Sequence, residues 1–596
     1  MAQLSETPDA QQQEFSTLLA SAHVQYVQSC RRVFLAASFP LSDAEIRALE
    51  ANGNWAEDWT GVRKTEQHSP LQTQRIRRCS FHGKVALGRF SASYRHDVDG
   101  IPFPCGVYNS ALSNAVVLDD ALVKDTLVLK NVLVDREASV IKCGTVAGPD
   151  EDAVCGNGNL LHVGVETGGR DLRVVANLPF SLAAQVAMRR GDVQFLKLYD
   201  AFVDKYVAEI KSPIAIVAPK ARVRGCTRVE GTFVGDFAVV EDCDVANSTI
   251  LSTELERSVV RTKSIVRDSI VQWNSTVEAL SVVEGAFLCD TSHVERHGVV
   301  MSSVIGPNTS IAEGEVTSSF VGPFVGFHHQ ALLIASIWPT GKGNIGYGAN
   351  VGSNHTLKAP DQELFHGEGH MISSLSPAIN EISPGWVLSS SVFTVLRNED
   401  KFRSRNKSKR TQIEAEIFRP EIVQYMKDAR TELAAAEGKA KISLANGEAV
   451  YTDKQVRGLG KNYMRESSRR AGIAAYTFFI KLYALDALLA LVESGRVSAD
   501  GTVGSVDRSH YPLVTLAEEL DAEKSIRECL SDLVSMRIEV VKKAADGKAR
   551  DDVRGQRTIP DYSDVHKPAA SEAVVLRAQR TVNDVKQRVA AFVARV

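Results

Sequence analysis

The chain has 596 residues, which is too long for one hydrophobic core and predicts at least two domains. Its net charge of −3 argues against a general affinity for nucleic acid or anionic membranes. Nine scattered cysteines without a C-x-x-C pair argue against a disulfide framework or a zinc ribbon. The N-terminus is polar and no apolar run reaches membrane-spanning length, so we expect a cytoplasmic protein without a membrane span.

The first 75 residues predict helices. Residues 12–38 have the apolar spacing of an amphipathic helix. In "LSDAEIRALEANGNW", Ser42 fits an N-cap and Glu45 fits the third helical position of a capping box. We therefore assign residues 1–75 to an N-terminal helical segment.

A short unit of one small or hydroxyl residue followed by two aliphatic residues recurs in the middle of the chain. It reads SVV or SIV at 258–260, 264–266, 269–271 and 281–283, and SVI at 303–305. Neither a period of two nor a period of 3.6 fits these windows, which argues against hairpins and helices. Repeats of five or six residues predict a parallel β-helix, with aliphatic residues in a stacked core and small residues at the corners.

Two blocks of these repeats flank a segment of different character. Residues 76–150 and 212–398 carry the β-type repeats, whereas 151–211 begin with a loop rich in Gly and Asn and continue with helical spacing. We interpret 151–211 as an insertion that leaves the β-helix and returns to it. The rest of the chain predicts a helical domain over 399–596, with a buried helix at 476–493 and a heptad-like helix at the C-terminus.

The basic run 401–410 joins the repeats to this helical domain. Acidic residues follow it at once, and it lacks the interleaved aromatic residues that stack on single-stranded nucleic acid. We interpret it as a solvated linker or a subunit contact, and we expect no nucleic-acid partner.

The run "NSTILSTELERSVVRTKSIVRDSIV" followed by "SSVIGPNTSIAEGEVTSSFVG" resembles the hexapeptide-repeat superfamily of left-handed β-helix proteins, which includes trimeric acyltransferases. Three further stretches, "GNGNLLHVGVETGGR", "WPTGKGNIGYGANVGSNHT" and "APDQE", are similar to a family of large β-helix proteins of unknown function labelled hexapeptide transferases. The resemblance implies a mainly β fold: a left-handed parallel β-helix with an inserted helix, helical ends and a homo-oligomeric state, trimer or dimer.

Histidines are concentrated in one region: five of the fourteen are His328, His329, His355, His366 and His370. Imidazole accepts a proton near neutral pH. In hexapeptide acyltransferases a histidine on the β-helix deprotonates the acceptor. The resemblance therefore implies that His328 or His329 is the base and that His355 is a second or orienting residue.

Turns rich in Gly and Asn supply candidate substrate contacts, because they bring backbone N–H groups close to a ligand, and an arginine can clasp a phosphate or carboxylate. The candidate substrate-binding residues are Lys342, Asn344, Asn354, Asp361 and Glu363 near the histidines, and Asn157, Asn159, Glu166 and Arg170 in the inserted loop.

These features favour a transferase that moves an acyl group from acyl-CoA or acyl carrier protein to a sugar or sugar nucleotide, with a small-molecule substrate as partner and no bound cofactor. One alternative is a non-enzymatic sugar-nucleotide-binding or scaffold protein, which the long helical C-terminal third favours. Another is a metal site like that of γ-class carbonic anhydrases, with His366 and His370. The glycines of "HGEGH" predict a loop there, not the helix face that a zinc-binding pair at this spacing needs, so we expect no metal.

Overall fold

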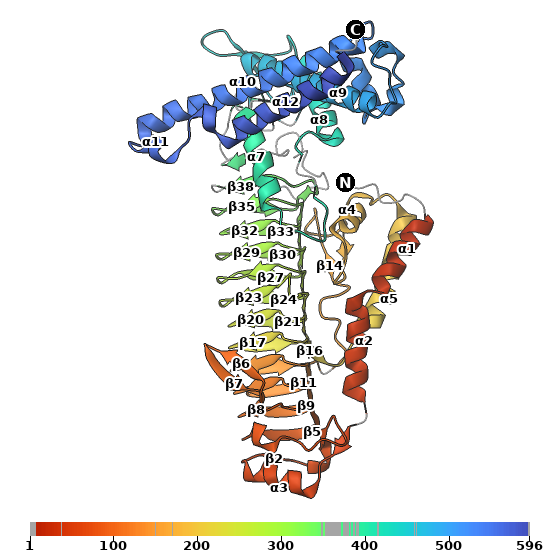
Figure 1. Cartoon of the computed structure of the whole chain (residues 1–596), viewed down its shortest axis with the longest axis vertical. Coiled ribbons are helices and arrows are strands. Elements are labelled where there is room, and N and C mark those ends of the chain that lie inside the picture. Colours follow the sequence, from red (N-terminus) through yellow and green to blue (C-terminus); the bar gives the residue numbers. More distant parts are fainter. Residues whose placement is uncertain are drawn as a thin grey trace. The chain divides into compact units, whose positions relative to one another are not determined.

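The computed structural model (Figure 1) describes residues 8–36, 38–149, 151–169, 171–346, 350–351, 371–373, 381, 383–385, 388, 392–413, 416–457, 459 and 462–593. The chain divides into two compact units. The first unit comprises Met1–Pro360 with Lys407–Ile413, and the second comprises Asp361–Asn406 with Glu414–Val596. The predicted repeats up to residue 360 fall in the first unit. Residues 361–398, which the sequence assigned to the repeats, fall in the second unit with almost all of the predicted helical domain.

The first unit is built from short parallel strands stacked in three columns, as a parallel β-helix requires. In the described part of this unit, twelve strands form column 1, and columns 2 and 3 together form a 23-stranded sheet. Successive strands of a column come from successive coils, so that Val283 pairs with Val300 and Val300 with Val316. The described part of this unit is therefore mainly β with long parallel sheets, as the repeats predict.

The strands of the columns are the following. Column 1 contains β4 (Ile76–Arg77), β8 (Gly106–Tyr108), β10 (Leu122–Lys124), β12 (Ser139–Ile141), β17 (Arg222–Arg224), β20 (Val239–Glu241), β23 (Val259–Arg261), β26 (Thr276–Val277), β29 (His293–Glu295), β32 (Ser310–Ala312), β35 (Gly326–Phe327) and β38 (Asn344–Gly346). The strand β40 (Met371–Ser373) belongs to the second unit. Column 2 contains β2 (Trp55–Ala56), β13 (Thr145–Ala147), β18 (Arg228–Glu230), β21 (Asp244–Ala246), β24 (Ile265–Arg267), β27 (Val282–Glu284), β30 (Val299–Met301), β33 (Glu315–Thr317), β36 (Leu332–Ile334) and β39 (Asn350–Val351). Column 3 contains β3 (Val62–Lys64), β16 (Ala215–Val217), β19 (Phe233–Val234), β22 (Thr249–Ile250), β25 (Ile270–Val271), β28 (Phe287–Leu288), β31 (Val304–Ile305), β34 (Phe320–Val321) and β37 (Ile337–Trp338). The longer strands β5 (Ser80–Leu87), β9 (Ala111–Val117) and β11 (Val128–Val134) run through columns 2 and 3.

Strands also occur in the segment that the sequence predicts as helical. β2 and β3 pair in parallel with β5, and β1 (Phe39–Pro40) pairs with β3 antiparallel. The parallel sheets thus begin before residue 76. The predicted capping box is confirmed in α3 (Asp43–Ala51), where the Ser42 hydroxyl accepts from the Glu45 backbone N–H and the Glu45 carboxylate accepts from the Ser42 backbone N–H.

Serine side chains explain why the S-V-V unit repeats. Ser303 and Ser319 are fully buried at a corner between columns 2 and 3. The Ser303 hydroxyl donates to the Met301 carbonyl at 2.7 Å and accepts from the Ser319 backbone N–H at 2.9 Å in the next coil. The Ser319 hydroxyl in turn accepts from the backbone N–H of Ser336 at 3.1 Å. Each hydroxyl forms hydrogen bonds with backbone N–H and C=O groups at a corner. The hydrogen bonds between paired strands do not extend to these groups, because the strands end before the corner.

Replacement of one of these hydroxyls should have a measurable cost. Ser319→Ala leaves the buried backbone N–H of Ser336 and the carbonyl of Thr317 without their side-chain partner. We expect a loss of roughly 1–2 kcal/mol in the free energy of unfolding, measured by urea titration. Ser310→Ala, on the half-buried outer face of column 1, is the matched control and should change stability by less than about 0.5 kcal/mol. Equal effects of the two variants would contradict this role.

Helices cover the outer face of column 3, where the side chains are apolar. They are α1 (Pro8–Leu19), α2 (Ala22–Leu35), α4 (Phe180–Met188) and α5 (Val193–Ile210). Their buried side chains join those of Phe233, Ile270, Phe287 and Phe320 in one hydrophobic cluster. The insertion predicted at 151–211 therefore leaves the stack of strands and packs back on it.

Two single helices predicted from the sequence are each broken in two. The helix predicted at 12–38 ends at Leu19, and Ser21, with an extended backbone, is the N-cap of α2. The helical spacing within 179–212 is interrupted between Met188 and Val193, and the Asp192 carboxylate caps α5 by accepting from the Phe195 N–H. Apolar spacing alone does not detect such breaks, because the buried stripe continues across them.

The basic run 401–410 is not solvated throughout, in contrast to the linker interpretation. The Arg410 guanidinium lies 3.7 Å from the centre of the Trp273 ring and donates two hydrogen bonds to Glu256. Ser408 and Thr411 both hydrogen-bond the carboxylate of Asp290, whose pKa is raised by burial. The segment Lys407–Ile413 is thereby held on a corner of the stacked strands.

The second unit is helical, as predicted. Its helices are α7 (Val392–Arg405), α8 (Pro420–Ala435), α9 (Glu466–Glu493), α10 (Ile526–Thr558), α11 (Tyr562–Val565) and α12 (Ala573–Val593). A small antiparallel sheet contains β41 (Ile442–Ser443), β42 (Ala449–Tyr451) and β43 (Met464–Arg465). By length and composition alone α9 could cross a membrane, yet 56% of its most apolar window is buried within the protein.

Candidate functional site

The predicted base His328 lies on the outer face of column 1. It follows Phe327, which is fully buried in the interior, so the alternation of the strand directs His328 outward, where it is half-buried. Its backbone N–H donates to the Ile345 carbonyl at 3.0 Å. Burial, and secondarily the neighbouring His329, lower the pKa of the His328 imidazole. A neutral imidazole at neutral pH is the form that accepts a proton.

His329 occupies the next position, at a corner of the coil with φ of +63°. Its ring is exposed, its Nδ1 lies 3.5 Å from the Glu313 carboxylate, and the two histidine rings are 6.0 Å apart. Glu313 also lines an open hollow of about 570 Å³ on this side, together with His297, Gln330 and Leu332. His329 and Glu313 thus lie beside a hollow on the surface of the stacked parallel strands.

Several other predicted site residues lie outside the described residues. These are His355, Asn354, Asp361, Glu363, His366, His370 and Arg170. Two of the predicted substrate-binding residues near the histidines are described. Asn344 begins β38, and Lys342 is a corner residue that is 3% exposed. Among the residues that the structure describes, no group of three His, Cys, Asp or Glu side chains is placed to hold a metal ion.

The two predicted asparagines of the inserted loop fasten that loop to the stacked strands. Asn157 is buried, and its side-chain amide donates to Thr249 Oγ1 at 3.1 Å while its Oδ1 accepts from the Ala176 N–H at 2.6 Å. Asn159 donates to the Asp268 carbonyl at 2.7 Å. Glu166 is half-buried in the same loop. The asparagines therefore position the loop that carries the next pair of residues.

A histidine–carboxylate pair that sequence reasoning missed lies at the end of this loop. His162 directly follows β14 (Leu160–Leu161) and Asp171 directly precedes β15 (Leu172–Arg173). Because β14 and β15 pair antiparallel, with Leu161 opposite Leu172, the two side chains lie next to each other. His162 Nδ1 is 2.7 Å from Asp171 Oδ1. A carboxylate at Nδ1 orients the ring and leaves Nε2 as the proton acceptor.

Other contacts fix this pair in place while leaving the imidazole accessible. The His162 backbone N–H donates to the Ser302 hydroxyl at 2.9 Å, and Arg190 donates to the Asp171 carbonyl at 2.8 Å. Leu161 and Leu172 are fully buried, so the hairpin is anchored in the hydrophobic cluster. The His162 side chain is nevertheless 43% exposed. The geometry is that of a base held by an orienting carboxylate and open to a substrate.

Gly168 is required where the loop closes over this pair. Its φ is +86°, and a Cβ at this position would lie 3.3 Å from both His162 Nδ1 and Asp171 Oδ1. Gly168 of "ETGGR" thus has a local steric reason. His162 itself lies in "GNGNLLHVGVETGGR", and the signal that could have identified it is an acidic residue across a hairpin whose turn contains three glycines.

The sequence of residues 39–362 matches a protein family described as "Domain of unknown function (DUF4954)". The chain belongs to the DUF4954 family. The DUF4954 match begins at β1 and includes the inserted loop with His162 and Asp171. A protein of Treponema pallidum (strain Nichols) described as "Uncharacterized protein" is 20% identical over 468 residues, which are 70% of this chain and 64% of that protein. The chain therefore spans just under two thirds of that relative. No solved structure matches the chain significantly.

Proposed function

We propose that the DUF4954 region is a left-handed, hexapeptide-type β-helix that transfers an acyl group to a sugar or sugar nucleotide, with His162 as the general base. The observation that supports this role is the 2.7 Å contact between His162 Nδ1 and Asp171 Oδ1 at an accessible imidazole. The resemblance implied His328 or His329 as the base, and His328 is the alternative base for the same reaction. The nature of the transferred group rests on the resemblance of the repeats to acyltransferases.

The proposed reaction needs one proton transfer and one displacement. Asp171 accepts the Nδ1–H of His162, so that Nε2 takes the proton of the acceptor hydroxyl as its oxygen attacks the carbonyl carbon of the thioester. The new C–O bond forms, the C–S bond breaks, and the thiolate leaves. The proton on Nε2 then passes to that thiolate. An ester and a free thiol are the products, and the base is regenerated.

Activity of His162 variants tests the proposal. His162→Ala should lower the rate of thiol release from acetyl-CoA, assayed with a panel of sugar nucleotides, by at least 10²-fold, the usual contribution of a general base. Asp171→Asn should lower it less, because the ring loses its orientation but keeps its proton acceptor. Thermal unfolding of each variant should match that of the wild type, since His162 is partly exposed.

Two histidine variants serve as controls. His297→Ala removes an exposed corner histidine and should leave thiol release unchanged. His328→Ala distinguishes the two candidate bases. If His328→Ala loses thiol release while His162→Ala keeps it, His328 is the base and His162 is not. Stabilisation by sugar nucleotides without thiol release from any acyl-CoA would favour the non-enzymatic alternative.

A further inference from the structure

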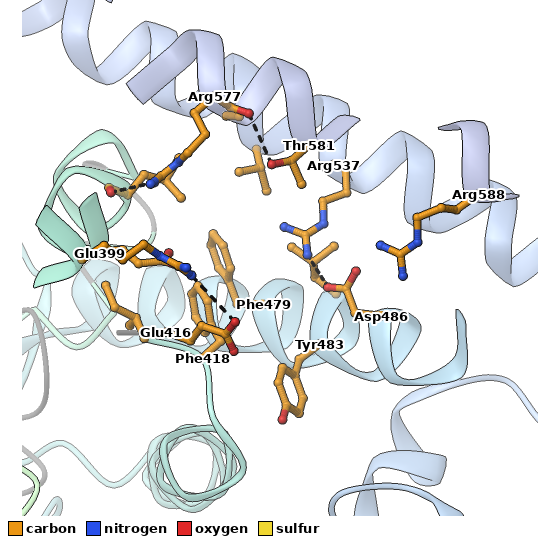
Figure 2. A pocket seen from close by; sticks show the side chains of 16 residues that line it. Glu399, Glu416, Phe418, Phe479, Tyr483, Asp486, Arg537, Arg577, Thr581 and Arg588 are labelled. Atoms are coloured by element: carbon orange, nitrogen blue, oxygen red, sulfur yellow. Dashed lines mark hydrogen bonds and ion pairs between the residues drawn. The ribbon is translucent and has the colours of Figure 1, made fainter. Parts of the chain in front are cut away.

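The second unit contains a cavity of about 570 Å³ within its helical core (Figure 2). It is lined by residues of α7, α9, α10 and α12 and by the segment 416–418 before α8. This volume is in the range of small-molecule sites, which are usually mostly apolar with a few polar groups. The cavity belongs to a different unit from His162, and its role is independent of the transferase proposal.

One wall of the cavity is flat and apolar. The rings of Phe418 and Phe479 are stacked, with centroids 5.2 Å apart and planes 7° from parallel. Leu396, Leu482 and Val540 continue the apolar lining. Such a wall accommodates a planar or aliphatic body, because burial of apolar surface is favourable without directional contacts.

Four arginines contribute the positive charge: Arg403, Arg537, Arg577 and Arg588. Carboxylates outside the lining hold two of them, since Arg577 pairs with Asp400 and Arg588 makes two 2.7 Å contacts to Glu493. These outer carboxylates fix the direction of the guanidinium groups. A guanidinium held in this way is preorganised for a carboxylate or phosphate.

Three carboxylates also line the cavity: Glu399, Glu416 and Asp486. Glu399 accepts from Arg403 at 2.7 Å. Asp486 lies apart from Glu399 and Arg403. Its carboxylate accepts a hydrogen bond of 2.5 Å from the Arg537 guanidinium, and Arg588 lies on its other side (Figure 2). Four arginines and three carboxylates line the cavity, and Asp400 and Glu493 outside the lining balance the charges of Arg577 and Arg588. Burial raises the pKa of Asp486, so the protein holds this anion at a cost.

We propose that this cavity binds a small organic anion, a carboxylate or phosphate monoester on an apolar body. The acidic group lies between Arg537 and Arg588, and the body packs against Phe418 and Phe479. In the unliganded protein Asp486 occupies part of the anion position and neutralises Arg537. The incoming anion competes with that carboxylate for the same guanidinium.

Calorimetric titration of the full chain with four probes tests the site. Phenyl phosphate and benzoate carry both the acidic group and the apolar body, inorganic phosphate lacks the body, and benzyl alcohol lacks the charge. We expect the first two to bind at least tenfold more tightly than the last two. The order of phenyl phosphate and benzoate then tells which acidic group the site prefers.

A gain of affinity is the sharpest result, because misfolding cannot produce it. Asp486→Asn removes the competing charge at nearly constant volume and should tighten binding of phenyl phosphate about tenfold. Arg588→Gln should weaken it about tenfold. Arg470→Gln, at an exposed arginine of α9 that does not line the cavity, is the control and should leave affinity unchanged.

Three outcomes would overturn the proposal. They are the absence of binding of either aromatic anion at millimolar concentration, equal binding of inorganic phosphate and phenyl phosphate, and unchanged or weaker affinity in a folded Asp486→Asn protein. Weaker binding in Arg588→Gln together with tighter binding in Asp486→Asn would establish it.

Discussion

Val300→Asp is expected to unfold the first unit, whereas Val299→Asp, one residue earlier in the same strand, is expected to be tolerated. Val300 is the middle residue of β30, is fully buried, and stacks between Val283 and Val316 of the adjacent coils. Val299 faces outward and is partly exposed. A carboxylate in the stacked core has no partner, so we expect a loss of roughly 4 kcal/mol or more in the free energy of unfolding.

Urea unfolding of the full chain, followed by far-UV circular dichroism, measures both variants. The two share the same strand and the same substitution, and differ only in the face to which the side chain points. Val299→Asp should cost less than about 1 kcal/mol. Equal destabilisation by the two variants would show that β30 does not alternate between interior and surface as the parallel coils require.

The periodic part of this fold could be predicted from the sequence because each coil solves the same physical problem. Every strand of a coil needs an apolar residue inside, and the corner between columns 2 and 3 needs a small residue that can satisfy backbone groups. Ser303 and Ser319 meet the second need through contacts of their hydroxyls with neighbouring coils. A short unit repeated many times is visible in one sequence without any knowledge of long-range contacts.

The candidate site could be predicted only in part. His162 and Asp171 become neighbours through the pairing of β14 with β15, and no spacing rule marks such a pair. The predicted Asn157 lies in the same loop, but its amide is engaged in holding the loop on the strands. Gly- and Asn-rich turns thus indicated the right segment without indicating which side chain would face a substrate.

The cavity of the second unit had no sequence signal at all. Its lining residues come from four helices and are spread from Leu396 to Arg588. α7 and α10 each place one arginine among apolar residues, α12 places two, and α9 places a single aspartate. Each of these is an ordinary amphipathic pattern. Only the packing of the helices converts these separate residues into one charged cavity.

The coverage of column 3 bears on the oligomers that the resemblance implies. Its outer face is apolar, with Phe233, Phe287 and Phe320 packed beneath helices of the same chain. A subunit contact through this column would have to displace those helices and expose their apolar side chains. Any trimer or dimer of this chain should therefore use other surfaces. The contacts of His162 with Asp171 and Ser302 are formed within one chain.

In the second unit, Glu466→Gln should have the largest effect on stability. The Arg469 guanidinium is 2% exposed and donates two hydrogen bonds of 2.8 Å to the Glu466 carboxylate. Tyr451 donates to the same carboxylate at 2.6 Å. A neutral amide leaves the buried arginine with only the exposed Glu437 carboxylate, 3.5 Å away, as a counter-charge. We therefore expect a loss of roughly 3 kcal/mol, measured by urea unfolding. Arg470→Ala removes an exposed partner of the same carboxylate and should cost less than about 1 kcal/mol.

The pH dependence of unfolding gives an independent test of the same pair. The hydrogen bonds from Arg469 lower the pKa of Glu466 in the folded protein to about 2. An unfolded glutamate titrates near pH 4.3, so the stabilisation by this carboxylate is complete above that pH and is lost as the pH falls toward 2. Glu466→Gln should remove this contribution, so the difference in unfolding free energy from the wild type should shrink as the pH falls from about 5 to 2. A difference that stays constant across this range would show that Glu466 does not act through its charge.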